Sequence, residues 1–258
     1  MTIPFTKAHG ALNDFILTWS DEVPADLPLR AAAIAICDRN AGVGADGWIL
    51  VERNLPAIRL INSDGSDAEI SGNGTRCAAA LLVEAGIASE NVVIHTGAGE
   101  KHLRLIHRDG HRYQFEMDMG LPEVREETTL AGYPAVVMWV GNPQCALVCD
   151  EIPENWVDLG RHLESDPRWP NRSNISFVRA IDRNTVQARF YERGAGWTKS
   201  SGTGSTGAAF AAMHKGLVEP PLTVLTEAGP LELRQDGTLF LTGPVEVISR
   251  GDFFFSGH

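Results

Sequence analysis

The sequence predicts an α+β fold, dominated by sheet and built from two related halves. When Ser71 is placed on Ser201, the motif Ser-Gly-x-Gly coincides in both copies. The match then continues without a gap as far as Gly99, which falls on Gly229. Agreement over such a length indicates a duplicated structural unit. Apolar residues that alternate along several segments indicate that each unit consists mainly of β-strands.

Each copy of the repeat has the same predicted order of elements. A strand, at 58–62 or 188–192, is followed by a glycine-rich turn and an alanine-rich helix. Gly86 and Gly216 are expected to end the two helices, because glycine readily adopts the left-handed conformation that follows a helix. Thr75 and Ser205 are the predicted N-caps.

The surroundings of these helices can also be predicted. Their sequences, CAAALLVEA and GAAFAAMHK, are apolar on most sides, which favours a helix enclosed by its own half. Further strands are predicted from the alternation of Tyr113, Phe115, Met117 and Met119, and from the apolar runs 135–140 and 222–226. Each half is therefore expected to be a curled, mostly antiparallel sheet around one central helix.

The boundary between the halves is predicted near residue 118. A stretch rich in Pro and Glu, 121–134, is expected to be the crossing from one half to the other. The predicted halves are 1–118, joined by a C-terminal strand at 248–258, and 119–247.

Composition excludes several classes of protein. The formal net charge is −11 with no basic stripe, so neither nucleic acid nor an anionic membrane is an expected partner. The N-terminus lacks the features of an export signal and no apolar run reaches membrane-spanning length, so we expect a cytoplasmic location. The four cysteines do not form zinc-type pairs; Cys145 and Cys149 lie in an apolar, strand-like segment. We expect reduced, buried thiols and no metal.

The two Ser-Gly-x-Gly turns are candidates for an anion-binding site. The first turn of a helix carries unpaired N–H groups and a partial positive charge, and glycine lets a ligand approach the backbone closely. A single such turn would be better explained as a tight turn capped by serine. If the halves are related by a pseudo-twofold axis, however, both turns can face one substrate, with Ser71 and Ser201 on opposite sides.

The chain resembles the diaminopimelate epimerases, which are isomerases that work without pyridoxal phosphate. The resemblance rests on the order and spacing of segments along nearly the whole sequence: KAHGALNDF (7–15), AGVGADG (41–47), INSDGS (61–66), SGNGTRC (71–77), GNPQC (141–145), SNISF (173–177), YERGAG (191–196) and SGTG (201–204). It implies the fold of that family, a small amino-acid substrate, no cofactor and a homodimer.

The resemblance also implies roles for individual residues. Four positions match those that hold the distal, non-reacting end of the substrate: Asn62, Asn142, Asn174 and Arg193. Asn13 and Glu192 match further site positions. The backbone amides of four residues match those that hold the carboxylate of the reacting centre: Gly72, Asn73, Gly202 and Thr203.

The catalytic positions depart from the family. Two cysteines exchange the Cα proton there, whereas this chain has Ser71 and Ser201. A thiol has a pKa of about 8.5 and an alcohol lies much higher, so serine needs a neighbouring group to remove its proton. Glu192 could do this, act directly on the substrate, or form only an ion pair with Arg193. His9 is expected to be a packed or hydrogen-bonding residue.

Three other departures occur: Gly47 replaces glutamine, Gln144 replaces histidine and Trp197 replaces glutamate. Trp197 is expected at most to cover the cleft. Three functions therefore remain open. The first is conversion of LL- to meso-2,6-diaminopimelate in lysine biosynthesis. The second is a one-base isomerisation or elimination on another small acid, as in the phenazine-pathway isomerase or the hydroxyproline dehydratases, and the third is amino-acid binding without turnover.

Overall fold

The computed structural model describes residues 1–256 and divides the chain into two compact units. Unit 1 contains residues 1–117 and the chain from Pro244 onward, and unit 2 contains Asp118–Gly243. Gly257 and His258, the last residues of the predicted strand 248–258, lie outside the described residues. The divisions fall within strands β8 (Arg112–Gly120) and β17 (Thr238–Phe254).

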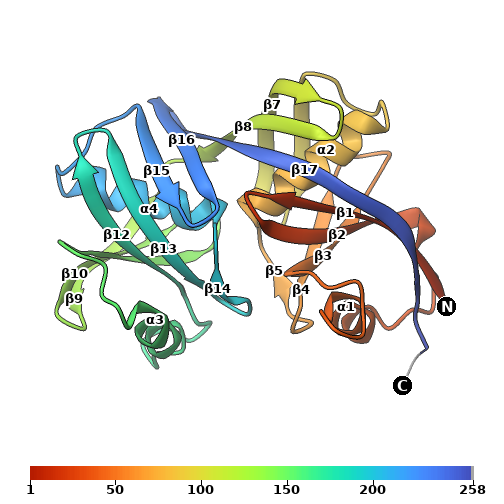
Figure 1. Cartoon of the computed structure of the whole chain (residues 1–258), viewed down its shortest axis with the longest axis horizontal. Coiled ribbons are helices and arrows are strands. Elements are labelled where there is room, and N and C mark those ends of the chain that lie inside the picture. Colours follow the sequence, from red (N-terminus) through yellow and green to blue (C-terminus); the bar gives the residue numbers. More distant parts are fainter. Residues whose placement is uncertain (257–258) are drawn as a thin grey trace. The chain divides into compact units, whose positions relative to one another are not determined.

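Unit 1 is a curled sheet with one enclosed helix and one outer helix (Figure 1). Besides its parts of β8 and β17, its elements are β1 (Thr2–Gly10), β2 (Asn13–Trp19), the 3-10 helix η1 (Ser20–Glu22), α1 (Leu29–Cys37), β3 (Gly47–Val51), β4 (Ile58–Asn62), β5 (Asp67–Ala68), α2 (Gly72–Glu84), β6 (Asn91–Thr96) and β7 (Gly99–Asp109). Helix α2 contacts β1, β2, β3, β4 and β6, so the sheet surrounds it. Helix α1 packs on β3 and β4.

Unit 2 repeats this plan. Besides its parts of β8 and β17, its elements are β9 (Glu123–Leu130), β10 (Tyr133–Trp139), β11 (Pro143–Val148), α3 (Trp156–Glu164), β12 (Asn174–Asp182), β13 (Thr185–Glu192), β14 (Gly196–Thr198), α4 (Gly202–His214), β15 (Leu222–Thr226) and β16 (Gly229–Asp236). Helix α4 contacts the strands β10, β11, β12, β13, β15 and β16, whereas α3 packs on β12 and β13.

Strand pairing shows the duplication more clearly than sequence identity does. In unit 1, β1 pairs antiparallel with β2, β2 parallel with β3, and β3 antiparallel with β4. In unit 2, β10, β11, β12 and β13 pair in the same order with the same directions. The predicted sheet-dominated α+β fold of two related halves is therefore confirmed.

Most of the predicted strands are also confirmed. The ranges 58–62 and 222–226 coincide with β4 and β15. In β8, the alternating residues Tyr113, Phe115, Met117 and Met119 are at most 4% exposed. The stretch 121–134 is different, because most of it is β9, which pairs antiparallel with β10. Several side chains of β9 are exposed, and its threonines and valine favour β-structure. A high content of charged residues was therefore not sufficient to identify a linker.

Both central helices are as buried as their sequences predicted. Every residue of α2 from Gly72 to Val83 is buried, and so is the first half of α4. Gly86 and Gly216 follow the helices with φ values of 71° and 69°, as expected for residues that end a helix.

The predicted N-caps were wrong by one turn. The caps are Ser71 and Ser201, which have extended backbone conformations and accept hydrogen bonds from the N–H groups of Gly74 and Gly204. Thr75 instead donates its hydroxyl to the Ser71 carbonyl at 2.8 Å. The glycine-rich turns are thus the first turns of the helices, because a serine cap stabilises them despite the low helix propensity of glycine.

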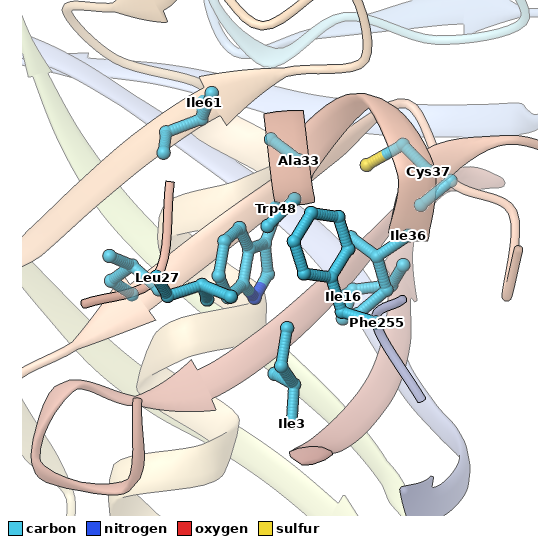
Figure 2. Packing of buried hydrophobic residues seen from close by; sticks show 12 residues of the cluster. Ile3, Ile16, Leu27, Ala33, Ile36, Cys37, Trp48, Ile61 and Phe255 are labelled. Atoms are coloured by element: carbon cyan, nitrogen blue, oxygen red, sulfur yellow. The ribbon is translucent and has the colours of Figure 1, made fainter. Parts of the chain in front are cut away.

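A hydrophobic core between α1 and the sheet fixes the outer layer of unit 1 (Figure 2). Trp48 lies at its centre and is fully buried, near Leu27, Ile16 and Phe255. Its indole N–H donates to the hydroxyl of Thr18 at 2.9 Å, so no polar atom of the ring is left unpaired. The four cysteines are free and buried, as predicted.

Candidate functional site

In unit 2 the first turn of α4 holds Ser201 against a carboxylate. The Ser201 hydroxyl oxygen accepts the N–H of Gly204 at 3.0 Å and its hydrogen is donated to Oε1 of Glu192 at 2.6 Å. Ser201 is only 2% exposed, and Glu192 is the last residue of β13. A short hydrogen bond from a buried hydroxyl to a carboxylate is the geometry needed for transfer of its proton.

Glycine at position 204 makes this geometry possible. A Cβ atom there would lie 2.8 Å from both Cδ1 of Phe190 and Oγ of Ser201. Because both distances are shorter than van der Waals contact, a side chain would displace the serine.

Three buried polar side chains brace the same turn. Nε2 of Gln144 is 2.7 Å from Oδ1 of Asn142 and 3.1 Å from Oγ1 of Thr203, and Asn142 Nδ2 is 3.3 Å from that hydroxyl. Gln144 was noted in the sequence only as a departure from the family. Its position beside Thr203 shows that it supports the first turn of α4.

Asn174 fixes the backbone of the loop that carries Arg193. Its Oδ1 accepts the Arg193 N–H at 3.0 Å, and its Nδ2 donates to the carbonyl of Pro143 at 2.8 Å. The guanidinium of Arg193 lies 3.3 Å from the Asn171 carbonyl. Unit 2 therefore brings together all seven of its predicted site residues in one connected region: Asn142, Asn174, Glu192, Arg193, Ser201, Gly202 and Thr203.

Trp197 lies on the face of the β13–β14 hairpin that does not carry the Glu192 side chain. It is directly opposite Tyr191 in the β13–β14 pair and packs edge-on against Trp156, with ring centroids 6.5 Å apart. Its indole N–H donates to Glu227 at 2.8 Å. Because neighbouring residues of a strand point to opposite faces, Trp197 and Glu192 are on opposite sides of this hairpin.

In unit 1 the first turn of α2 holds Ser71 without a carboxylate. Its hydroxyl oxygen accepts the Gly74 N–H at 3.1 Å, and no carboxylate among residues 1–256 accepts its hydrogen. Gly74 is again closely packed, since a Cβ there would lie 2.9 Å from Cδ1 of Ile49. The two predicted catalytic serines therefore have the same capping role but different polar partners.

A buried chain of hydrogen bonds leads away from this turn. Asn73 Nδ2 donates to Asn13 Oδ1 at 3.2 Å, and Asn13 Nδ2 donates to Asp46 at 2.6 Å. Burial and the negative charge of Asp14 raise the pKa of Asp46. Burial also acts to raise the pKa of Asp14, but its bonds to Arg39 and Lys7 outweigh this and lower it.

Asn62 and His9 each form a local hydrogen bond with a residue three or four positions away. The Asn62 side chain donates to Ser66 Oγ at 3.0 Å, and within residues 1–256 no hydrogen bond joins it to Asn13 or Asn73. His9 Nδ1 accepts the N–H of Leu12 at 3.3 Å, which agrees with the predicted hydrogen-bonding role.

Sequence reasoning missed Asp46 and the buried guanidinium of Arg76, which donates to Asn73 Oδ1. The spacing of Asn73 and Arg76, one helical turn apart, was an available signal. No group of three or more His, Cys, Asp or Glu suited to a metal occurs within residues 1–256. None of the helices in this part of the chain has the length and apolar character needed to cross a membrane.

Solved structures share the fold of two duplicated units. A hydroxyproline epimerase from Agrobacterium vitis, bound to trans-4-hydroxy-L-proline, matches with a TM-score of 0.73 and 15% identity, over 97% of this chain and 92% of that chain. A phenazine biosynthesis protein of the PhzF family from Bacillus anthracis matches with a TM-score of 0.71 and 14% identity, over 99% and 100%. This chain thus has the fold that the hydroxyproline epimerase and the PhzF protein share.

Sequence comparison defines the family more narrowly. The diaminopimelate epimerase family model matches residues 5–124 and 136–248. The diaminopimelate epimerase of Moorella thermoacetica is 36% identical over 276 residues, covering 96% of this chain and 98% of that protein. Diaminopimelate epimerase 1 of a Nostoc species is 35% identical, covering 97% and 99%. The chain belongs to the diaminopimelate epimerase family.

Proposed function

We propose that this chain interconverts LL- and meso-2,6-diaminopimelate without a cofactor, with Ser71 and Ser201 at the two proton-transfer positions. The observation that carries the proposal is the 2.6 Å hydrogen bond between Ser201 and Glu192 at the N-terminus of α4. It gives the serine the proton acceptor that the change from cysteine makes necessary. Full-length similarity to diaminopimelate epimerases supports the choice of substrate.

The carboxylate of the reacting centre is assigned to the first turns of α2 and α4. The amides concerned are those of Gly72, Asn73, Gly202 and Thr203, which stand among the first N–H groups of their helices. Such groups have no partner within the helix, and the helix dipole places a partial positive charge there. This charge also stabilises the negative charge that develops when the Cα proton leaves.

The distal end of the substrate is assigned to four other residues. Arg193 can hold the distal carboxylate with two parallel hydrogen bonds, and the amide of Asn174 fixes the Arg193 backbone. The remaining assigned residues are Asn62 and Asn142, with Asn13 supporting Asn73 from behind. Amides suit a zwitterionic end because each offers both a donor and an acceptor.

Proton removal is assigned to Ser201 and Glu192 acting together. As the Ser201 oxygen takes the Cα proton, its own hydrogen moves to Glu192, so no free alkoxide forms. The carbanion is then protonated on its opposite face by the hydroxyl of Ser71. Ser71 regains a proton from water, and the hydroxide that this leaves takes the proton from Glu192, which restores both groups. For the reverse reaction the same steps run backward, and the substrate ends with inverted configuration at one carbon.

The size of the serine handicap shows why Glu192 matters. If thiol and alcohol pKa values differ by about 5 units, an unassisted serine is disfavoured by roughly 7 kcal/mol. General-base assistance typically contributes about 10² to 10⁴ in rate, so the pair recovers part of this difference. We therefore expect a slower enzyme than one with two cysteines.

A one-base reaction is the second candidate. It is supported by the inequality of the two serines, because only Ser201 donates to a carboxylate within residues 1–256. A single base is sufficient for a hydrogen shift or an elimination on another small amino or carboxylic acid. A third possibility is a protein that binds an amino acid without turning it over.

One experiment separates the three candidates. Purified protein is incubated with LL-diaminopimelate in D₂O, and stereoisomers and deuterium content are followed by chiral chromatography and mass spectrometry. The proposal predicts meso product carrying deuterium at one Cα. Deuterium in unchanged LL isomer indicates that one base alone acts on this compound, and the absence of both binding and exchange indicates that another small acid is the substrate. Calorimetric binding without deuterium incorporation indicates a binding protein.

We also propose a cytoplasmic homodimer. The reduced, buried cysteines support the location. An apolar groove of about 570 Å³ between α1 and the end of β17 supports the dimer, since Ile34 is 46% exposed and Phe254 75% exposed there. Sedimentation should give twice the mass of the 28.0 kDa chain, and Phe254→Asp should shift it toward that of the monomer.

A further inference from the structure

Arg76 is a buried cation that forms no ion pair with a carboxylate within residues 1–256. It lies in the second turn of α2, is fully buried, and donates one hydrogen bond, from Nη2 to Oδ1 of Asn73. Its Nε and Nη1 have no partner among residues 1–256. Because the side chain of a helical residue points back toward the preceding turn, the guanidinium lies beside the first turn of α2.

A buried charge without a counter-charge lowers the free energy of unfolding. Burial lowers the pKa of Arg76 to about 10, so the group remains charged near neutral pH, below that pKa. Unpaired buried charges are rare because they lose their hydration without compensation. A group of this kind therefore calls for an anion that is not part of the chain.

The repeat provides an internal comparison. The residue of α4 that corresponds to Arg76 is Thr206, which donates to the Gly202 carbonyl at 3.0 Å. Helix α4 thus lacks a buried cation in its second turn but has Glu192 beside its cap, whereas α2 has the cation and, in the described part of the chain, no carboxylate bonded to its cap. The N-termini of α2 and α4 have similar backbone conformations, but a cationic side chain lies beside the first and an anionic side chain beside the second.

We propose that Arg76 is a positioning residue whose charge strengthens the α2 N-terminus as a carboxylate-binding site. The inference rests on the proposed function, in which the Gly72 and Asn73 amides hold the substrate carboxylate. Arg76 acts in two ways: its positive charge adds to that of the helix terminus, and its hydrogen bond holds the Asn73 side chain against Asn13. The incoming carboxylate supplies the missing counter-charge.

Two variants separate the charge from the hydrogen bond. Arg76→Gln retains an amide donor toward Asn73 but has no charge, whereas Arg76→Met has neither. If the charge matters, both should weaken binding of LL-diaminopimelate by about tenfold or more in calorimetry at pH 7. Arg108→Gln removes a charge from the exposed β7–β8 hairpin and should change the affinity by less than about twofold.

A measurement without ligand makes the test independent of the substrate. Replacing an unpaired buried charge by an apolar group of similar length should leave Tm unchanged or raise it, so ligand-free Arg76→Met is expected to be no less stable. A fall in Tm of more than about 10 °C would show that Arg76 is a structural residue and overturn the inference. Wild-type affinity in Arg76→Gln would overturn it equally. Absence of binding by the unaltered protein would instead overturn the proposed function.

Discussion

Ser201 has two roles that are separable by mutation. Its oxygen caps α4 and its hydrogen is donated to Glu192, so the same hydroxyl serves the stability of the helix and the proposed proton transfer. The capping bond involves the backbone of Gly204 and not the carboxylate. A change at Glu192 can therefore alter the chemistry and leave the cap intact.

Glu192→Gln should lower the rate of Cα proton exchange by about 10² or more, because an amide cannot accept the serine proton. Tm should change little, since the cap bond to Gly204 remains. Glu227→Gln is the matched control, because Glu227 accepts a hydrogen bond from Trp197 on the other face of this hairpin. Equal rates for the Glu192→Gln variant and the unaltered protein, measured by NMR in D₂O, would exclude Glu192 as the proton acceptor.

At the level of single residues, the sequence indicates candidate site residues but not the contacts that they make. The pairing of Glu192 with Ser201 was one of several alternatives, because the two residues are nine positions apart and belong to different elements. Residues from different elements meet only when the sheet curls around its helix. The buried Arg76 was missed for a related reason: burial of a charged residue depends on what surrounds the whole helix.

At the scale of elements, helix α4 requires glycine at one position and only tolerates it at another. Gly204 has no room for a Cβ atom, whereas a Cβ at Gly207 would lie 3.5 Å from Met138 Sδ and would make ordinary contacts. Glycine is thus required by packing at position 204. At position 207 it only lowers the helix propensity, and alanine would fit.

Gly204→Ala should destabilise the protein by about 1–3 kcal/mol and displace Ser201, because its Cβ would overlap the serine. Gly207→Ala should instead be neutral or stabilise by about 0.5–1 kcal/mol, as expected for alanine in a helix interior. Urea unfolding would measure both changes. Equal stability of the two variants would contradict the packing described around Ser201.

The positions of the helix starts illustrate the limit of prediction at this scale. Glycine-rich sequence suggested a turn before each helix, and the caps were placed at Thr75 and Ser205. The helices begin one turn earlier, since burial on all sides and a serine cap outweigh the low helix propensity of glycine. Burial is a tertiary effect, so local sequence rules could not supply it.

At the scale of the whole molecule, the duplication was the most predictable feature. Identity at corresponding positions, such as Gly86 and Gly216, showed the repeat, and the strand pairing of the units follows the same order. The C-terminal strand was expected to join the first half, but the strand that it pairs with was not predicted. In unit 1, β1 pairs with the C-terminal part of β17, and in unit 2 the equivalent β10 pairs with β9.

The four cysteines provide a measure of global unfolding. Burial raises the pKa of Cys37, Cys77, Cys145 and Cys149 to about 12. At pH 8 these thiols are thus protonated and shielded in the folded protein, whereas an exposed thiol has a pKa of about 8.5. Native protein should not react with Ellman's reagent over minutes, and unfolded protein should release four equivalents. Rapid labelling of native protein would contradict the described burial.

The proposed mechanism places Ser71 and Ser201 at the two proton-transfer positions. The most direct measurement is the rate of Cα deuterium exchange of LL-diaminopimelate in D₂O, compared between the unaltered protein and the Ser71→Cys, Ser201→Cys double variant. A thiol at a helix N-terminus reaches its anionic form far more easily than an alcohol, so the double variant should exchange faster, and each single variant should gain less. An equal or slower rate in a double variant that still binds the ligand would place the two serines away from the reacting carbon and contradict the account.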